Sequence, residues 1–101
     1  WSKKAEPSWF GFPITLKDES RIKRVELLKF YDENRIGTRL LFGGNIILQP
    51  AYQESNLGNP EKFPVANKVV NDTFWLGVYP GLSFEMLDFV TEKTEEFINS
   101  L

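Results

Sequence analysis

The side chains of this sequence that could do chemistry are carboxylates, amines, guanidinium groups and phenols, because histidine and cysteine are both absent. Without cysteine, the chain cannot contribute a disulfide, a thiolate nucleophile or thiolate ligands to zinc or an iron–sulfur cluster. Without histidine, it lacks the usual general base and the commonest nitrogen ligand for metals. An enzyme built from these residues could still rely on carboxylates, lysine or tyrosine, but its choice of catalytic groups would be small.

The charged residues are nearly balanced, with 12 basic and 14 acidic side chains and a formal net charge of −2. A nucleic-acid partner is not expected, because binding one would require clustered lysine and arginine in excess. No apolar run approaches the roughly 20 residues of a membrane helix, and no signal-peptide pattern opens the chain. These observations predict a cytoplasmic protein without membrane insertion. Its start at Trp1 rather than methionine indicates a piece of a larger protein.

Residues 71–83, NDTFWLGVYPGLS, place three aromatic side chains within six positions and lead through a Pro-Gly turn toward a helix. Period-two alternation puts Phe74 and Leu76 on one face of a strand and Trp75 and Tyr79 on the other. The Phe74 face is expected to pack in the core. The Trp75/Tyr79 face then needs a second cover.

The other elements follow from hydrophobic periodicity and turn residues. Strands are predicted over 9–16, 38–42 and 73–79, and helices over 21–34, 64–70 and from Ser83 to the C-terminus. In the first strand, Pro13 cannot donate to a ladder, which predicts an edge position. Four alternating apolar residues of that strand are expected on the core face: Phe10, Phe12, Ile14 and Leu16. Ser83 is expected to cap the last helix, and Asn34 or Gly37 to end the first in a left-handed conformation.

This order of elements predicts an α+β fold, a small sheet of about three strands with helices packed on it. Residues 1–8 are expected to be a lead-in and 9–101 a single small domain. The segment 43–63 is predicted to be a long irregular loop. Such loops are often functional or packed against a partner.

Four stretches together, SWFGFPI, RIGTRLLFGGN, QPAY and NDTFWLGVYPGLS, resemble the C-terminal segment of the DegT-type sugar-nucleotide aminotransferases. Within that family they are most similar to the CDP-6-deoxy-4-hexulose 3-dehydrase branch, vitamin B6-dependent enzymes of O-antigen and lipopolysaccharide biosynthesis. The resemblance runs from about Trp9 to the C-terminus. The stretch 71–83 is its most specific part.

The resemblance implies the small C-terminal domain of a fold-type-I enzyme whose large domain holds pyridoxal or pyridoxamine phosphate. In the dehydrase branch a histidine replaces the Schiff-base lysine, the cofactor amine condenses with a 4-keto nucleotide sugar, and the C3 hydroxyl is eliminated. A [2Fe–2S] cluster and a reductase partner then deliver electrons. It further implies a homodimer. Because this chain has no histidine or cysteine, it is expected to be inactive alone, with no catalytic residue and no metal site, and to bind neither the vitamin B6 cofactor nor the iron–sulfur cluster.

The resemblance also implies which residues lie near the cofactor and the sugar. They are Phe10 as an apolar wall, Arg39 as a partner for a phosphate or a large-domain carboxylate, the loop Gly43, Gly44 and Asn45, and Lys68, where the family usually has arginine. Trp75 and Tyr79 are expected to meet the large domain or the partner subunit. Each has a structural alternative. Phe10 could be a core aromatic, Arg39 part of a surface salt bridge, and the glycine loop a plain strand-ending turn. Lys68 could be a solvated helix residue, and Trp75 and Tyr79 could pack on the chain's own helices.

Two other functions fit the same sequence. An ordinary sugar aminotransferase shares the fold, and it differs by a lysine at the Schiff-base position, which lies outside this chain. A stand-alone binding module could use the aromatic face to stack on a sugar or a peptide.

Overall fold

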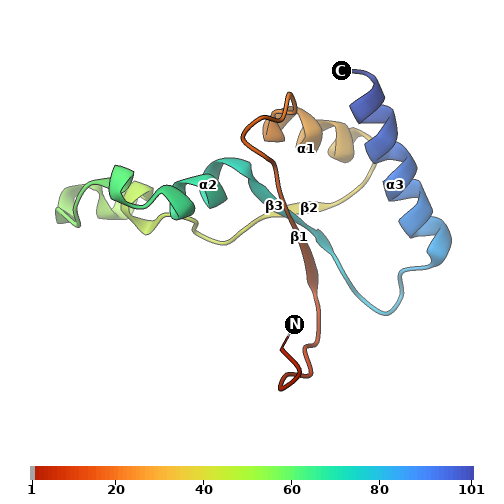
Figure 1. The fold of residues 1–101 in the computed structure, drawn as a ribbon, viewed down its shortest axis with the longest axis horizontal. Helices are drawn as coiled ribbons and strands as arrows, with labels where there is room; N and C mark the ends of the chain where they lie inside the picture. The colour runs from red at the N-terminus through yellow and green to blue at the C-terminus, as the bar shows by residue number, and fades with distance from the viewer. Residues whose placement is uncertain (1) are drawn as a thin grey trace.

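Three antiparallel strands form a small sheet in the computed structural model, which describes residues 2–101. β1 (Gly11–Thr15) and β2 (Thr38–Leu40) both pair with the central strand β3 (Thr73–Gly77). The outer position of β1 confirms the edge strand predicted from Pro13. In Figure 1 the strands cross at the centre, with α1 and α3 beside them. Trp1, the first residue of the expected lead-in, lies outside the described residues.

The helices are α1 (Arg24–Glu33), α2 (Pro64–Asp72) and α3 (Phe84–Asn99), so the predicted α+β class is confirmed. The segment expected to be one irregular loop contains three 3-10 helices, η1 (Ile46–Leu48), η2 (Pro50–Ser55) and η3 (Pro60–Lys62). Figure 1 shows that these turns and α2 form an arm extending away from the sheet. Side-chain caps from Asn45 and Asn59 stabilise two of the turns, a local signal that hydrophobic periodicity does not detect.

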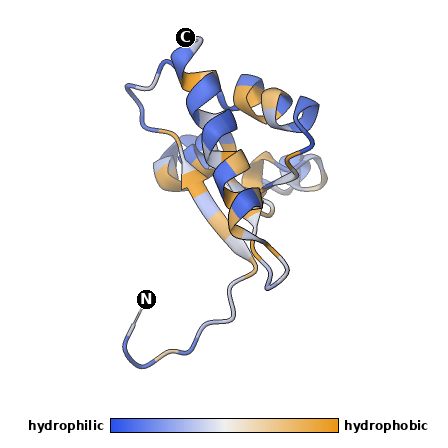
Figure 2. Ribbon diagram, turned by 90° about the vertical axis from the view of Figure 1, so that its right-hand side faces the viewer, coloured by the Kyte–Doolittle hydropathy of each residue, from blue (hydrophilic) through white to orange (hydrophobic). Residues whose placement is uncertain are grey.

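The core lies between the sheet and the helices α1 and α3. Its buried apolar residues are Leu27 and Tyr31 of α1, Ile36, Phe74 of β3 and Phe97 of α3. Phe74 is fully buried, as its alternation predicted. In Figure 2 hydrophobic residues occupy much of the crossing strands and alternate with hydrophilic ones along the helices. One face of the sheet is therefore covered by the chain's own helices.

The expected core face of the first strand is correct for only part of its residues. Ile14 and Leu16 pack against the core, but Phe10 and Phe12 are mostly exposed. The strand begins at Gly11, so alternation does not extend to Phe10, whose ring lies against Trp75 instead. Phe12 pairs with Leu76 near the end of the sheet, where α1 and α3 no longer cover it.

The helix ends show where local signals act. Ser83 caps α3 as predicted, because its Oγ accepts a hydrogen bond from the Met86 amide at 3.3 Å. The reversal after α1 falls on Arg35, with φ of 60°, rather than on Asn34 or Gly37. The Ile36 amide donates to the Tyr31 carbonyl at 2.8 Å, the bond of a Schellman motif, and Ile36 is then buried. Burial of Ile36 accounts for a non-glycine residue at the reversal.

Arg24 connects the first helix to the second. Its Nη1 donates to the carbonyls of Val70 at 2.5 Å and Thr73 at 3.0 Å, at the junction of α2 and β3. Carbonyls at a helix end lack partners within the helix, and a guanidinium is well suited to bind two of them. This contact ties the start of α1 to the point where the arm joins the sheet.

The chain is more extended than a self-contained domain of its length. Its radius of gyration is 16.3 Å, with extents of 49 × 40 × 24 Å, whereas about 13 Å is typical of 100 residues. Within residues 2–101, no helix combines the length and apolarity needed to cross a bilayer. The long arm and the small core together leave much apolar surface at the exterior.

Candidate functional site

Three aromatic rings meet on the face of the sheet opposite the core. We name Phe10, Phe42 and Trp75 the aromatic cluster. The Phe10 and Trp75 centroids are 4.7 Å apart at an interplanar angle of 76°, and those of Phe42 and Trp75 are 5.2 Å apart at 68°. Both are edge-to-face arrangements, the kind that aromatic pairs prefer. Trp75 is half-buried between two outer rings that are 65% and 77% exposed.

The backbone of β1 explains why Trp75 lies flat on this face. A side chain at Gly11 would overlap the indole of Trp75, so the ring occupies the space that the glycine leaves open. The missing side chain at Gly11 permits a close approach, and the group found there is this ring. Glycine at 11 thus positions Trp75, and through it the two phenylalanines.

Phe42 has an unusual backbone conformation. Its φ is 48°, in the left-handed region that bulky residues rarely adopt. Its amide donates to the carbonyl of Leu40 at 2.9 Å, so the chain turns sharply and β2 ends two residues before its predicted end. The turn directs the Phe42 ring back over Trp75. Sequence reasoning missed this residue, because the Gly-Gly pair that follows it predicted the turn one position later.

Arg39 lies beside the cluster. It pairs with Trp75 in the register of β2 and β3, and its Nη1 donates to the Thr38 carbonyl at 3.2 Å. Among residues 2–101, no carboxylate lies within 4.0 Å of the Arg39 guanidinium, so the alternative of a surface salt bridge is not seen there. The exposed guanidinium therefore remains available to an anion.

The loop Gly43, Gly44 and Asn45 packs against the arm. Gly44 has φ of 59°, and a side chain there would overlap Val70 of α2. Asn45 is 4% exposed; its amide donates to Asn67 Oδ1 at 2.7 Å and its Oδ1 accepts from the Ile47 amide. The features of this loop are thus used in packing and capping. Its approach to a ligand stays a prediction.

Lys68 of α2 is held by two carboxylates, those of Asp18 and, at 3.1 Å, Asp72. The hydrogen bonds to Asp18 and then Asp72 raise the pKa of the Lys68 amine above its ordinary value. A lysine that forms a Schiff base must lose its proton, so its pKa has to fall rather than rise. Lys68 is therefore unsuited to act as an amine nucleophile, and its contact with a sugar stays a prediction.

Tyr79 does not share a surface with Trp75, contrary to the expectation of a common face. β3 ends at Gly77, so alternation stops before Tyr79, whose ring lies over Gly81. Tyr79 lines an open, mostly apolar groove of about 1130 Å³ between the end of the sheet and α3, together with Phe12, Leu76 and Met86. Contact of Trp75 and Tyr79 with another domain stays a prediction.

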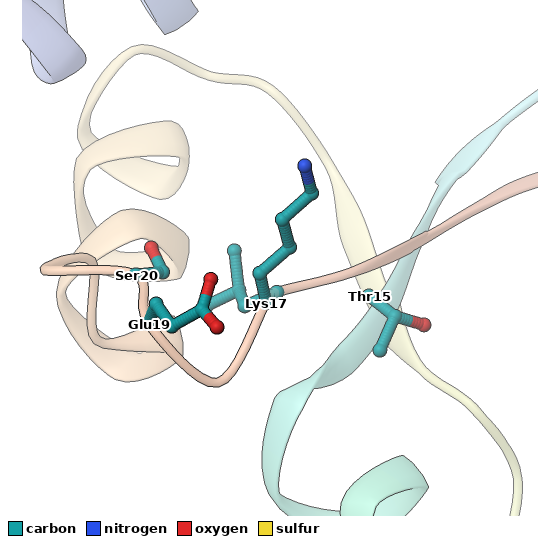
Figure 3. Close-up of a pocket in the computed structure, with 5 residues that line it drawn as sticks. Thr15, Lys17, Glu19 and Ser20 are labelled. Carbon is teal, nitrogen blue, oxygen red and sulfur yellow. The ribbon is translucent and has the colours of Figure 1, made fainter.

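A smaller hollow of about 400 Å³ lies at the connection from β1 to α1. Figure 3 shows that the side chains of Thr15, Lys17 and Glu19 spread in different directions there rather than converging. Within residues 2–101, no group of three or more acidic side chains could hold a metal ion. The aromatic cluster with Arg39 is thus the described feature best suited to contact a ligand.

Nearly all of the sequence matches a known family. The model of the DegT/DnrJ/EryC1/StrS aminotransferase family matches residues 1–95. The chain belongs to this family. It is also 52% identical over 96 residues to the lipopolysaccharide biosynthesis protein RfbH of Salmonella typhimurium, and 42% identical over 94 residues to the dTDP-4-dehydro-2,6-dideoxy-D-glucose 3-dehydratase of Saccharopolyspora spinosa.

These matches cover 95% and 93% of this chain but only 22% and 20% of the relatives. The chain therefore spans about a fifth of the length of the curated relatives it matches. The resemblance inferred from the motifs is confirmed at the level of the DegT family and its dehydratase members. The small sheet with its helices is consistent with a small domain of such an enzyme.

Proposed function

We propose that this chain is the small domain of a vitamin B6-dependent sugar-nucleotide 3-dehydrase in dideoxysugar and lipopolysaccharide biosynthesis. The observation that carries the proposal is 42% identity, across 93% of the chain, to a relative named as a 3-dehydratase of a dTDP-linked sugar. The name of the second relative, a lipopolysaccharide biosynthesis protein, supports the pathway. Residues 1–8 are the lead-in to the domain 9–101, and the enzyme is cytoplasmic.

The contribution of this chain is to close the substrate side of the cleft. Phe10 forms an apolar wall that excludes water, with Trp75 behind it at 4.7 Å. Arg39 offers an exposed guanidinium to a phosphate, because this planar group can bind two oxygens at once. The Gly43–Asn45 loop and Lys68 hold the arm near the substrate, and Tyr79 packs against the large domain.

The residues of this chain do not fit the role of holding the cofactor. When bound, pyridoxamine phosphate supplies the amine that condenses with the keto sugar. The chain offers no histidine for the Schiff-base position and no cysteine for a [2Fe–2S] cluster, and Lys68 is kept protonated by its two carboxylates. We assign the cofactor pocket, the cluster, the homodimer contact and the reductase site to the rest of the full-length protein.

The family description favours one alternative, an ordinary sugar aminotransferase. Such an enzyme would replace the C4 oxygen of the sugar with an amine from glutamate and keep the C3 hydroxyl. The dehydrase would lose the C3 hydroxyl as water and gain hydrogen at C3 after a two-electron reduction. The exposed aromatic rings also fit a stand-alone sugar- or peptide-binding module, which would change no bond in the sugar.

The test uses the full-length protein loaded with pyridoxamine phosphate and given a 4-keto-6-deoxy nucleotide sugar with a reducing system in deuterated water. We expect a 3-deoxy product with deuterium at C3, detected by mass spectrometry and NMR. A parallel reaction supplies pyridoxal phosphate and ¹⁵N-glutamate. Transfer of ¹⁵N to C4 with the C3 hydroxyl retained would show the aminotransferase. Binding without any product would favour the module.

A further inference from the structure

Phe42, an exposed aromatic residue with a strained backbone, comes three positions after Arg39, whose guanidinium contacts no carboxylate of residues 2–101. Phe42 has φ of 48° and its side chain is 77% exposed. Such a conformation costs about 1–2 kcal/mol for an L-residue, and burial in this chain does not offset that cost. Strained residues of this kind cluster at active sites, ligand clamps and switch regions. Phe42 is not required by the core.

The geometry leaves the outer ring available for stacking. Phe42 meets Trp75 edge to face, at 5.2 Å and 68°, so the pair does not occupy both faces of the Phe42 ring. Arg39 is fixed opposite Trp75 by the register of β2 and β3. Strand β2 and the turn after it therefore present a guanidinium and an aromatic ring three positions apart in the sequence. A planar ring that carries a phosphate has the complementary chemistry.

We propose that Phe42 and Arg39, supported by Trp75, form a subsite for the nucleotide half of a nucleotide sugar, with Phe42 stacking on the base and Arg39 binding the diphosphate. This inference rests on the proposed function for its substrate class and assigns a location to one part of that substrate. Stacking on an aromatic side chain tolerates any base. Phe42 therefore contributes affinity for the nucleotide rather than selection of one base.

The charge of Arg39 distinguishes this occupant from an apolar protein surface. A desolvated guanidinium without a carboxylate would be costly under an apolar cover, and no carboxylate of the described residues approaches Arg39. A diphosphate neutralises that charge and accepts two parallel hydrogen bonds from the guanidinium N–H groups. A bound nucleotide therefore satisfies the ring and the cation together.

The experiment measures nucleotide affinity on the full-length protein by isothermal titration calorimetry, with CDP, dTDP and inorganic pyrophosphate as separate probes. Phe42→Leu keeps an apolar side chain but removes the aromatic face, and Phe42→Gly also relieves the positive φ. Arg39→Lys keeps the charge but loses the fork. Phe84→Leu changes a comparably exposed phenylalanine on α3, which is 83% exposed, and serves as the matched control.

We expect both Phe42 variants to bind CDP and dTDP about five-fold or more weakly, the least that loss of one base stack produces, with pyrophosphate affinity unchanged. Arg39→Lys should weaken all three probes, and Phe84→Leu none. Unchanged nucleotide affinity in both Phe42 variants would overturn the proposal and assign the ring to packing against another domain. Equal weakening of pyrophosphate and nucleotides would also overturn it.

The result is separable from the test of the proposed function. Loss of water from the sugar can occur whether or not Phe42 contacts the base, and nucleotide binding requires no turnover. Thermal unfolding of the variants provides a second check. Phe42→Gly should be at least as stable as Phe42→Leu, because glycine adopts φ of 48° without strain. A less stable glycine variant would show that the side chain mainly supports the fold, and would count against the subsite.

Discussion

Replacing Gly44 with alanine tests whether the glycine loop serves packing. The residue has φ of +59°, and a Cβ there would overlap the Val70 side chain on α2. The left-handed conformation costs an L-residue about 1–2 kcal/mol. Forcing a methyl group into an occupied position typically costs a further 1–3 kcal/mol or so. We therefore expect Gly44→Ala to destabilise the contact between the loop and α2 by roughly 2–5 kcal/mol.

The assay is hydrogen–deuterium exchange on the full-length protein, followed by mass spectrometry of peptides from 43–48 and 64–72. Local opening sets the exchange rate of these amides, and each 1.4 kcal/mol or so changes an equilibrium about ten-fold. The expected destabilisation corresponds to exchange roughly 30-fold faster or more. Gly37→Ala is the matched control, because its φ is not positive and nothing lies within 4 Å of the added Cβ. It should leave exchange unchanged within about three-fold.

A second substitution separates the two causes. Val70→Ala removes the methyl group that the new Cβ would strike, but does not relieve the positive φ of residue 44. Adding Val70→Ala to Gly44→Ala should therefore recover the packing part, with a coupling of roughly 1–3 kcal/mol. Unchanged exchange in Gly44→Ala, or no recovery in the double variant, would refute the reasoning. Loss of substrate binding alone would instead support ligand approach by the loop.

Three further predictions concern contacts between elements. Tyr31→Phe should lower the free energy of unfolding, measured with denaturant, by about 1 kcal/mol. The Thr94 hydroxyl donates to the Val90 carbonyl, so it accepts the hydrogen bond from the Tyr31 hydroxyl at 2.7 Å. A change below about 0.3 kcal/mol would contradict this assignment. Arg24→Lys should speed exchange at the α2–β3 junction, because an ammonium lacks the fork that reaches both carbonyls, whereas a surface change such as Lys23→Arg should not. Because the pKa of Lys68 is raised, the stability from its ion pairs is fully present below the ordinary value of 10.5 and is lost as pH rises through the folded-state pKa. Lys68→Met should abolish this loss of stability at alkaline pH, measured by thermal unfolding. Persistence of the loss in the variant would exclude Lys68 as its cause.

Local signals in the sequence were sufficient where a single residue decides the conformation. Pro13 predicted the edge strand, Ser83 the start of α3, and alternation the burial of Phe74. These features depend on a missing donor, a short hydroxyl side chain and a period of two, which are properties of the sequence itself. The family was likewise identified from contiguous motifs. None of these features depends on which distant segments of the chain contact one another.

The features that could not be predicted depend on contacts between distant segments. The strand order β1-β3-β2 is set by pairing across more than 60 positions, from Phe12 to Leu76. The exposure of Phe10 follows from its packing on Trp75. The left-handed turn at Phe42 and the reversal at Arg35 occur at residues with no intrinsic preference for positive φ. In each case tertiary packing overrides the local pattern.

The two faces of the sheet differ in how they are packed, so the residues that we propose to contact a ligand are not those that stabilise the fold. On one face, Tyr31, Phe74 and Phe97 are buried by α1 and α3, and each is fixed by neighbours within the chain. On the other, the rings of Phe10 and Phe42 contact mainly Trp75 and remain exposed. Changes to the second face should therefore alter binding more than folding. That separation makes substitutions in the aromatic cluster informative about function, because their effects on affinity need not be corrected for loss of the core.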